Sequence, residues 1–339
     1  MEISIKKRAR LYSGTSNPAL AREIADHLGM ALEEVEIRRF PSGEIYVRYM
    51  GSARGTDAFV VQTHSHPINE MIMEQLLMID ALKRASAKRI IAVVPFYGYA
   101  RQDRKSLSRE PISARLIADL LQIAGADRVL SVDLHSGQIQ GFFDIPFDHL
   151  TAMAILAEYV KEKYPDRLVI VAPDAGRVRV AEKYAYHLHT PLALMHKRRQ
   201  PGPGGAPEIM DVVGNVEGKR CLVVDDMIDT AGTLVGAVDV LIERGAREVM
   251  AAATHPVFSG PALERVRHSA LTEVIVTNTL PLPTECLPDK ITVISIAPIL
   301  ASTIRAVFHD DSVSEIFQGE NQEAIPPELR SEPPAALDS

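Results

Sequence analysis

Cysteine is scarce in this sequence of 339 residues: only Cys221 and Cys286 are present, each inside or beside an apolar run. Neither has a metal-ligand partner at short spacing, which argues against a disulfide framework and a thiolate zinc site and favours buried, unreactive thiols. No stretch approaches the ~20 uninterrupted apolar residues of a membrane span. The N-terminus lacks the apolar segment of a signal peptide. We therefore expect a cytoplasmic protein without membrane contact.

Two further absences narrow the function. The formal net charge is −7, which argues against nucleic acid as a partner, because broad binding to a polyanion needs an excess of basic residues. The chain also has no Gly-x-x-x-x-Gly-Lys-Ser/Thr phosphate loop. Any polyphosphate must therefore be held by local clusters of another kind.

Short apolar runs alternate with amphipathic segments along the chain. The runs lie at 10–13, 58–62, 90–95, 129–132, 168–172, 221–225, 248–253 and 273–277, and the amphipathic segments at 67–85, 111–124, 175–188 and 232–244. This alternation is typical of βαβ units and predicts an α/β fold with mostly parallel sheets. The runs are almost continuously apolar, as expected of strands covered by helices on both faces.

The length predicts two domains, because a single core rarely grows beyond about 250–300 residues. Residues 81–95 resemble residues 241–256, each reading helix, small-residue turn, strand and proline, although any corner from helix to strand gives this pattern. We expect domains at 1–148 and 149–318, with the last helix a candidate to pack on the first domain. Residues 319–339 are rich in proline and acid, which predicts a disordered tail.

The segment VVDDMIDTAGT at 223–233 is the strongest candidate site. Ligands of open α/β sheets bind beyond the carboxyl ends of strands, and here a strand ends in two adjacent carboxylates before a turn and a helix. The helix N-terminus suits a phosphate, while Asp225 and Asp226 suit ribose hydroxyls or a magnesium ion. The alternative is an ordinary helix cap at Asp229 or Thr230.

This segment resembles the sugar-phosphate loop of the type I phosphoribosyltransferase fold. The resemblance implies a ribose 5-phosphate site made of Asp225, Asp226, Asp229, Thr230, Ala231, Gly232 and Thr233. The usual Gly-Gly pair of that fold is Ala231-Gly232 here. Alanine is acceptable at this position if its backbone does not need a positive φ.

A second segment, VDLHSGQIQGFF at 132–143, narrows the family. A lone histidine such as His135 is most often a core residue bonded to backbone, with metal ligand and base as alternatives. The whole run, however, resembles the signature of ribose-phosphate diphosphokinases, in which the histidine binds the metal–ATP complex. The resemblance covers residues 8 to about 318, with the motifs in family order.

The segment FYGYARQDRK at 96–105 resembles the nucleotide-contacting loop of this family. It carries Arg101, Gln102 and Asp103. An arginine suits this place because its plane can stack on adenine while its donors reach phosphate. A solvated charge run is the alternative, which the three preceding aromatic residues disfavour.

The segment FPSGEIY at 40–46 resembles the family's adenine-binding stretch. Phe40 and Glu44 match the pattern, whereas Ser42 replaces the usual acid. The change puts one nucleotide contact in question and leaves the donor preference open. Read without the family, the Ser-Gly pair indicates a hairpin turn.

Two further positions match the catalytic groups of the family. Asp174 follows an apolar strand, and the resemblance makes it a magnesium ligand together with His135. Lys197 and Arg199 match the catalytic loop, and alternate residues of an extended segment point the same way. A glycine-rich stretch follows at 202–207. A solvated basic turn is the alternative, and it fits Arg198 better than its two neighbours.

The resemblance implies two tandem phosphoribosyltransferase-like domains, each a mostly parallel sheet flanked by helices. It also implies Mg²⁺-dependent, in-line transfer of the diphosphoryl group of ATP to ribose 5-phosphate. AMP and 5-phospho-alpha-D-ribose 1-diphosphate would be the products, and they would feed nucleotide biosynthesis. The family forms homo-oligomers, hexamers above all, with ADP and phosphate as allosteric ligands. Ser312 and Ser314 lie where relatives have regulatory contacts, and a helix cap explains them equally well.

Two rival functions use the same loop. A phosphoribosyltransferase would consume the product instead, but it leaves residues 96–105 and 132–143 unexplained. A catalytically silent relative would act as a regulatory subunit or sensor. Ser42 and Ala231 support that second rival, whereas the intact Lys197 and Arg199 oppose it.

Overall fold

The computed structural model describes residues 7–198, 209–283 and 287–317. They divide into two compact units. The first consists of described residues within Met1–Thr151, Thr279–Pro281 and Ser295–Asn321, and the second of those within Ala152–Asn278 and Leu282–Ile294. The predicted disordered tail, 319–339, lies outside the described residues.

The first unit is built on a five-stranded parallel sheet in the order β1-β4-β5-β6-β7. Its strands are β1 (Ala9–Ser13), β4 (Asp57–Val61), β5 (Arg89–Val94), β6 (Arg128–Val132) and β7 (Phe147–Leu150). Every residue of β4 is buried. Such uniform burial requires cover on both faces of the sheet.

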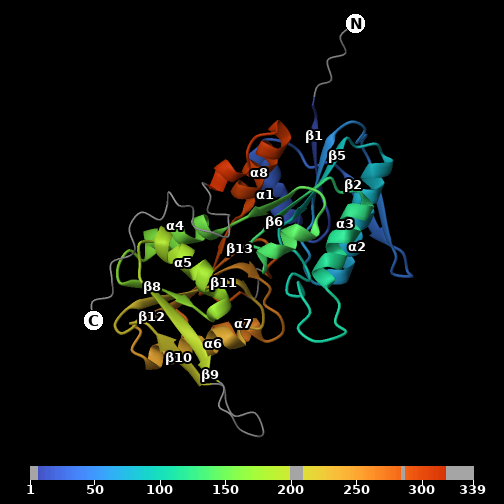
Figure 1. Ribbon diagram of the computed structural model, residues 1–339. Helices are drawn as coiled ribbons and strands as arrows, with labels where there is room; N and C mark the ends of the chain where they lie inside the picture. The colour runs from blue at the N-terminus through green and yellow to red at the C-terminus, as the bar shows by residue number, and fades with distance from the viewer. Residues whose placement is uncertain (1–6, 199–208, 284–286, 318–339) are drawn as a thin grey trace. The chain divides into compact units, whose positions relative to one another are not determined.

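Helices supply that cover. They are α1 (Pro18–Leu28), α2 (Ile68–Arg84), α3 (Ser113–Ala124) and α8 (Ala297–His309), with short 3₁₀ turns η1 (Gly137–Phe142) and η3 (Ser314–Phe317). Within this unit α2 and α3 lie on one side of the sheet, and α1 packs with α8 on the other (Figure 1). The last helix therefore belongs to the first unit, although the second unit lies between it and residue 151 in the sequence.

An antiparallel hairpin extends beside this sheet. It pairs β2 (Val35–Arg39) with β3 (Ile45–Tyr49). Between them the N–H of Phe40 donates to the carbonyl of Glu44 at 2.8 Å, and Gly43 has φ +93°. A positive φ at this point favours glycine, which confirms the hairpin turn expected from the Ser-Gly pair.

The second unit contains a seven-stranded sheet in the order β10-β9-β8-β11-β12-β13-β14. All neighbours are parallel except β9 and β10. The strands are β8 (Leu168–Ala172), β9 (Leu192–Arg198), β10 (Ile209–Val213), β11 (Arg220–Ile228), β12 (Glu248–Pro256), β13 (Glu273–Thr277) and β14 (Ile291–Ile294).

Helices again flank both faces of this sheet. They are α4 (Met153–Lys163), α5 (Val178–His187), α6 (Gly232–Glu243) and α7 (Ala262–His268), and the 3₁₀ turn η2 (Ala175–Arg177) precedes α5. Figure 1 shows α4 and α5 on one side and α6 and α7 on the other. Val238 and Leu241 of α6 pack with Val266 of α7 against alternate strand residues such as Val169 and Val223.

Both sheets confirm the predicted α/β class with mostly parallel strands flanked by helices. Each predicted apolar run lies on a strand, and each predicted amphipathic segment contains a helix. Within the ranges that the structure describes, no helix is long and apolar enough to cross a membrane.

Candidate active site

The loop between β11 and α6 leaves a helix N-terminus open to an anion. The N-cap of α6 is Ala231, one residue after Thr230, and it has no side-chain oxygen to accept a backbone N–H. The N–H of Val235 makes the first helical bond, to the Ala231 carbonyl at 3.0 Å. The N–H groups of residues 232–234 are therefore the ones that a helix leaves without internal acceptors. Such groups, aided by the helix dipole, bind phosphate.

Ala231 has a left-handed backbone, with φ +58° and ψ 5°. Alanine suits this position only if φ is not positive, and that condition is not met. At positive φ the alanine Cβ lies too close to the carbonyl oxygen. The cost is on the order of 1 kcal/mol relative to glycine. This loop conformation is held in spite of that strain, since Ala231 is itself buried against the core of the unit.

Arg265 of α7 supports the same loop from outside. Its guanidinium donates to the Thr230 carbonyl at 2.9 Å. A Cβ placed on Gly232 would meet the same guanidinium at 3.3 Å, so glycine allows this close approach. Arg265 therefore adds a cation beside the helix N-terminus, where an anion is favoured.

The two acids at the end of β11 share one cation. Nε of Arg177 lies 2.8 Å from Oδ1 of Asp225, and its Nη2 lies 2.7 Å from Oδ1 of Asp226. Asp226 is buried, and Asp225 is half-buried. Burial, followed by the hydrogen bond and charge of Asp226, raises the pKa of Asp225, and the Arg177 charge only partly opposes this. A ligand with hydroxyl donors, or a cation, would relieve the remaining repulsion between the acids.

Asp174 lies one turn before Arg177 and begins η2. Its Oδ1 accepts the N–H of Gly176 at 2.8 Å, and the residue is exposed beyond the end of β8. The carboxylate is thus oriented by its own backbone and keeps a second oxygen for an outside ligand. Among the described residues, no group of three or more His, Cys, Asp and Glu side chains forms a ready metal cage.

The predicted catalytic pair is only partly within the described residues. Lys197 lies on β9, where its backbone pairs with Met210 of β10. Arg199 lies outside the described residues. The strand bearing Lys197 runs next to β8, so its carboxyl end and Asp174 belong to the same edge of the sheet.

The predicted nucleotide loop at 96–105 begins from a buried anchor in the first unit. Phe96 and Tyr97 are buried, and the N–H of Gly98 donates to Nδ1 of His64 at 3.0 Å. Nε2 of His64 in turn lies 2.9 Å from Oε1 of Gln75. Because Nδ1 accepts, the proton sits on Nε2 and is donated to Gln75.

The three candidates of this loop differ in their surroundings. Oε1 of Gln102 accepts the Ser113 hydroxyl at 2.6 Å, and its carbonyl accepts the N–H of Ala114 at 3.2 Å. Gln102 therefore fastens the loop to the start of α3. Arg101 is exposed and Asp103 half-buried, so both have a surface that a ligand can reach.

The hairpin tip presents an aromatic cluster. Phe40 is 40% exposed and packs edge-on against Tyr46, with the guanidinium of Arg38 over both rings. The Ser42 hydroxyl donates to Oε2 of Glu44 at 2.7 Å. An acid at position 42 would instead face the Glu44 carboxylate, so serine changes the charge as well as the contact.

His135 follows β6 at the carboxyl edge of the first sheet. It is half-buried, just before η1, and Asp133 beside it has φ +36°. The N–H of the intervening Leu134 donates to Nε2 of His149 at 2.9 Å. This turn departs from strand geometry and brings His135 out of the sheet at the edge where ligands of α/β folds bind.

Each unit gathers its own candidates. The second brings together Asp174, Asp225, Asp226 and the loop at 229–233, whereas the residues at 40–44, 101–103 and 135 all belong to the first. Sequence reasoning assigned no role to Arg177, Arg265 or His64. Arg177 could have been found from the sequence, because it follows the predicted ligand Asp174 by three residues. The roles of Arg265 and His64 come from contacts with residues 35 and 34 positions away in sequence.

Two sheets flanked by helices, with an uncapped helix N-terminus after a strand that ends in paired acids, define a phosphoribosyltransferase-like α/β protein. Residues 9–125 match the N-terminal domain of ribose phosphate pyrophosphokinase, and residues 204–318 match the phosphoribosyl synthetase-associated domain. The chain belongs to the ribose-phosphate pyrophosphokinase family, which confirms the resemblance noted in its motifs.

Individual relatives agree with this assignment. The chain is 54% identical over 313 residues to the ribose-phosphate pyrophosphokinase of Streptomyces avermitilis, covering 92% of this chain and 97% of that protein. It is also 54% identical over 317 residues to the Mycobacterium leprae protein of the same name, covering 93% and 97%. The crystal structure of phosphoribosylpyrophosphate synthetase from Mycobacterium smegmatis matches with a TM-score of 0.86 and 54% identity, over 90% of this chain and 100% of that one.

Proposed function

We propose that this chain transfers the diphosphoryl group of ATP to ribose 5-phosphate, with the residues named above in the roles set out here. The observation that carries the proposal is the uncapped N-terminus of α6 beside the Arg177-bridged acids. One arrangement thereby offers donors for a phosphate and acceptors for sugar hydroxyls. Ribose 5-phosphate needs both in a single ligand.

Ribose 5-phosphate would lie with its phosphate at Thr230, Ala231, Gly232 and Thr233, with Asp229 at the start of the turn. The backbone N–H groups and the two hydroxyls supply donors to the phosphate oxygens. Asp225 and Asp226 would accept the ribose hydroxyls. The rigid pair of acids fixes the sugar, which leaves its anomeric oxygen in one orientation.

ATP would contact Phe40, Ser42 and Glu44 of the hairpin, Arg101, Gln102 and Asp103 of the loop, and His135. The exposed Phe40 ring supports stacking on adenine, and the exposed Arg101 supports contact with phosphate. Gln102 is held by Ser113 and would act mainly by positioning its neighbours.

We propose magnesium as the metal, with Asp174 and His135 as its protein contacts. Mg²⁺ in phosphoryl-transfer enzymes usually keeps several waters and binds one or two carboxylates together with substrate phosphates. The exposed Asp174 carboxylate is such a ligand, and His135 would complete the contact with the metal–ATP complex. When bound, the ion would neutralise phosphate charge.

Lys197 and Arg199 would provide the catalytic charge. In the reaction the anomeric oxygen attacks the β-phosphorus, the bond from that phosphorus to the oxygen retained by AMP breaks, and AMP departs. Two cations placed on the transferring group stabilise the charge that develops there. The position of Lys197 on a strand next to β8 supports its reach to the edge that carries Asp174.

We also propose a homo-oligomer, in keeping with a hexamer, acting in the cytoplasm. Helix α3 supports a subunit contact, because Leu116 is 56% and Ile123 75% exposed on it. ADP and phosphate are proposed as regulators near Ser312 and Ser314.

One assay tests the reaction: the protein is mixed with ATP, magnesium and ribose 5-phosphate, and the nucleotide product is identified. AMP forming in step with phosphoribosyl pyrophosphate is the expected result. ADP would indicate a simple kinase, and no turnover would favour the silent relative. Consumption of phosphoribosyl pyrophosphate with a base would favour the phosphoribosyltransferase.

A further inference from the structure

A cavity of about 610 Å³ opens at the amino ends of three strands in the second unit. Arg167, Pro191 and Lys219 all line it, and each directly precedes a strand: β8, β9 and β11 respectively. The proposed substrate residues follow the opposite ends of the same strands. Strands of five to nine residues rise by about 3.3 Å per residue, so the two places are roughly 15–30 Å apart.

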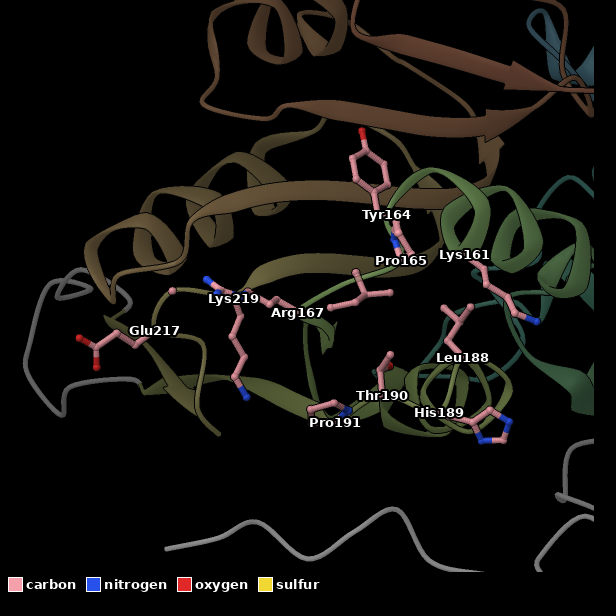
Figure 2. A pocket seen from close by; sticks show the side chains of 12 residues that line it. Lys161, Tyr164, Pro165, Arg167, Leu188, His189, Thr190, Pro191, Glu217 and Lys219 are labelled. Atoms are coloured by element: carbon pink, nitrogen blue, oxygen red, sulfur yellow. The ribbon is translucent and has the colours of Figure 1, made fainter.

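The charged side chains of this cavity are mostly basic. Lys161, Arg167, Lys219 and the imidazole of His189 line it, against the single carboxylate of Glu217. In Figure 2, Lys219 and Glu217 lie on one side, with Lys161 and His189 on the other.

The two cations next to the strands lack counter-charges. Lys161 is 3.4 Å from Glu158, but within the described ranges neither Arg167 nor Lys219 forms an ion pair. Lys219 is also half-buried. A partly buried cation without a carboxylate partner favours binding of an anion.

Two of these side chains stand on strained backbone. Arg167 has φ +54° and His189 φ +51°. His189 follows the end of α5, where its N–H donates to the Tyr186 carbonyl and that of Thr190 to the Ala185 carbonyl. Glycine usually occupies this position of a helix end, and another residue costs on the order of 1 kcal/mol. Arg167 and His189 thus line the cavity at positions where the backbone conformation alone favours glycine.

We propose that this cavity is a second ligand site, which takes a small organic phosphate. Lys219 and Arg167, which precede the neighbouring strands β11 and β8, bind the phosphate. Leu168, Leu188 and Pro191 supply apolar lining for the body of the ligand. The volume falls within the about 300–1,000 Å³ of small-molecule pockets. A phosphate ester therefore fits better than phosphate alone or an uncharged ring alone.

Phenyl phosphate is a suitable probe, with phenol and inorganic phosphate as comparisons. Hydrogen exchange on the full chain should show slower exchange at 186–192 and 216–220 with phenyl phosphate. The same protection should need a far higher concentration of phenol or phosphate. The exchange at 229–233 reports on the substrate loop separately, so occupancy of that loop cannot be mistaken for occupancy of the cavity.

Variants test the contacts. Lys219→Gln should weaken phenyl phosphate binding at the cavity roughly tenfold, the size expected for one charge-assisted bond. Arg167→Gln should weaken it too, because Arg167 is the second cation that contacts the phosphate. Arg84→Ala, which removes an exposed cation of the first unit, should leave binding unchanged.

Three results would overturn the proposal. One is protection by phenyl phosphate at 229–233 alone. Another is protection at the cavity that Lys219→Gln does not alter, or that phenol produces equally well. The third is phenyl phosphate binding that Arg167→Gln leaves unchanged.

Discussion

Nη2 of Arg177 lies 2.7 Å from Oδ1 of the buried Asp226. The same guanidinium reaches Asp225, so one cation on η2 fixes two acids at the end of a neighbouring strand. Without it, two adjacent carboxylates would repel each other in a place that water reaches poorly. Arg177 is therefore a positioning residue for the proposed ribose site.

Replacing this guanidinium should lower the stability of the second unit to unfolding. Arg177→Met leaves a buried carboxylate uncompensated, and we expect a loss of about 2 kcal/mol or more in the free energy of unfolding. Denaturant titration measures it. Arg179→Met removes an exposed arginine two residues on and should have little effect. Adding Asp226→Asn to Arg177→Met should restore part of the loss; equal stability of wild type and Arg177→Met would refute the argument.

Lys197→Ala should impair the reaction and spare sugar-phosphate binding. We expect turnover to fall by roughly 10² or more, as when one preorganised charge donor is lost. Initial rates of AMP formation give turnover, and calorimetry gives the affinity for ribose 5-phosphate. Arg198→Ala on the same strand is the matched control and should keep most activity. Near-normal turnover of Lys197→Ala would exclude Lys197 from the catalytic step.

Ala231→Gly should relieve the left-handed strain at the start of α6. The expected gain is up to about 1 kcal/mol in the free energy of unfolding, reduced by the extra freedom of glycine in the unfolded chain. Thermal melting of the two proteins, each without ligand, tests this. Ala237→Gly, within the same helix, serves as the contrasting change and should destabilise. A clear loss of stability in Ala231→Gly would show that its methyl packing outweighs the strain.

The first unit should lose stability in mild acid because of His64. Complete burial lowers the pKa of His64 to about 4 from an ordinary value near 6.5. Between these values the unfolded chain binds the proton and the folded chain does not, so stability falls as the pH drops from 6.5 to 4. Full protonation would cost on the order of 3 kcal/mol.

Unfolding titrations at pH 6.5, 5.5 and 4.5 test this effect. His64→Asn keeps an acceptor for the Gly98 N–H and cannot take up a proton, so its stability should depend less on pH. His189→Asn, an exposed histidine of the second unit, provides the comparison. Equal pH dependence of wild type and His64→Asn would remove His64 as the cause.

The sequence predicted central strands better than edges. β4 and β8 are buried throughout, so their apolar runs are unbroken and easily read. β10 is an edge strand that pairs on one side only, and the β2–β3 hairpin mixes charged with apolar residues. Such strands carry a weak apolar signal, because only one face or part of it is covered.

The candidate site was predictable where chemistry is local. The paired acids and the following turn at 223–233 stand together in sequence and in space. The backbone angle of Ala231 was not predictable, because alanine can adopt several φ/ψ conformations until the surrounding loop selects one. Contacts of Arg265 and His64 arise only when distant helices and strands pack, which a single sequence does not reveal.

The left-handed backbone of Ala231 also affects how much conformational entropy the phosphate loop loses when it binds its ligand. Glycine at position 231 would sample several backbone basins, whereas alanine, once the loop is folded, is confined to few. The loop therefore loses fewer conformations when the phosphate arrives. Binding of ribose 5-phosphate should carry a smaller entropic penalty here than in a relative with the Gly-Gly pair, even where the two affinities are equal.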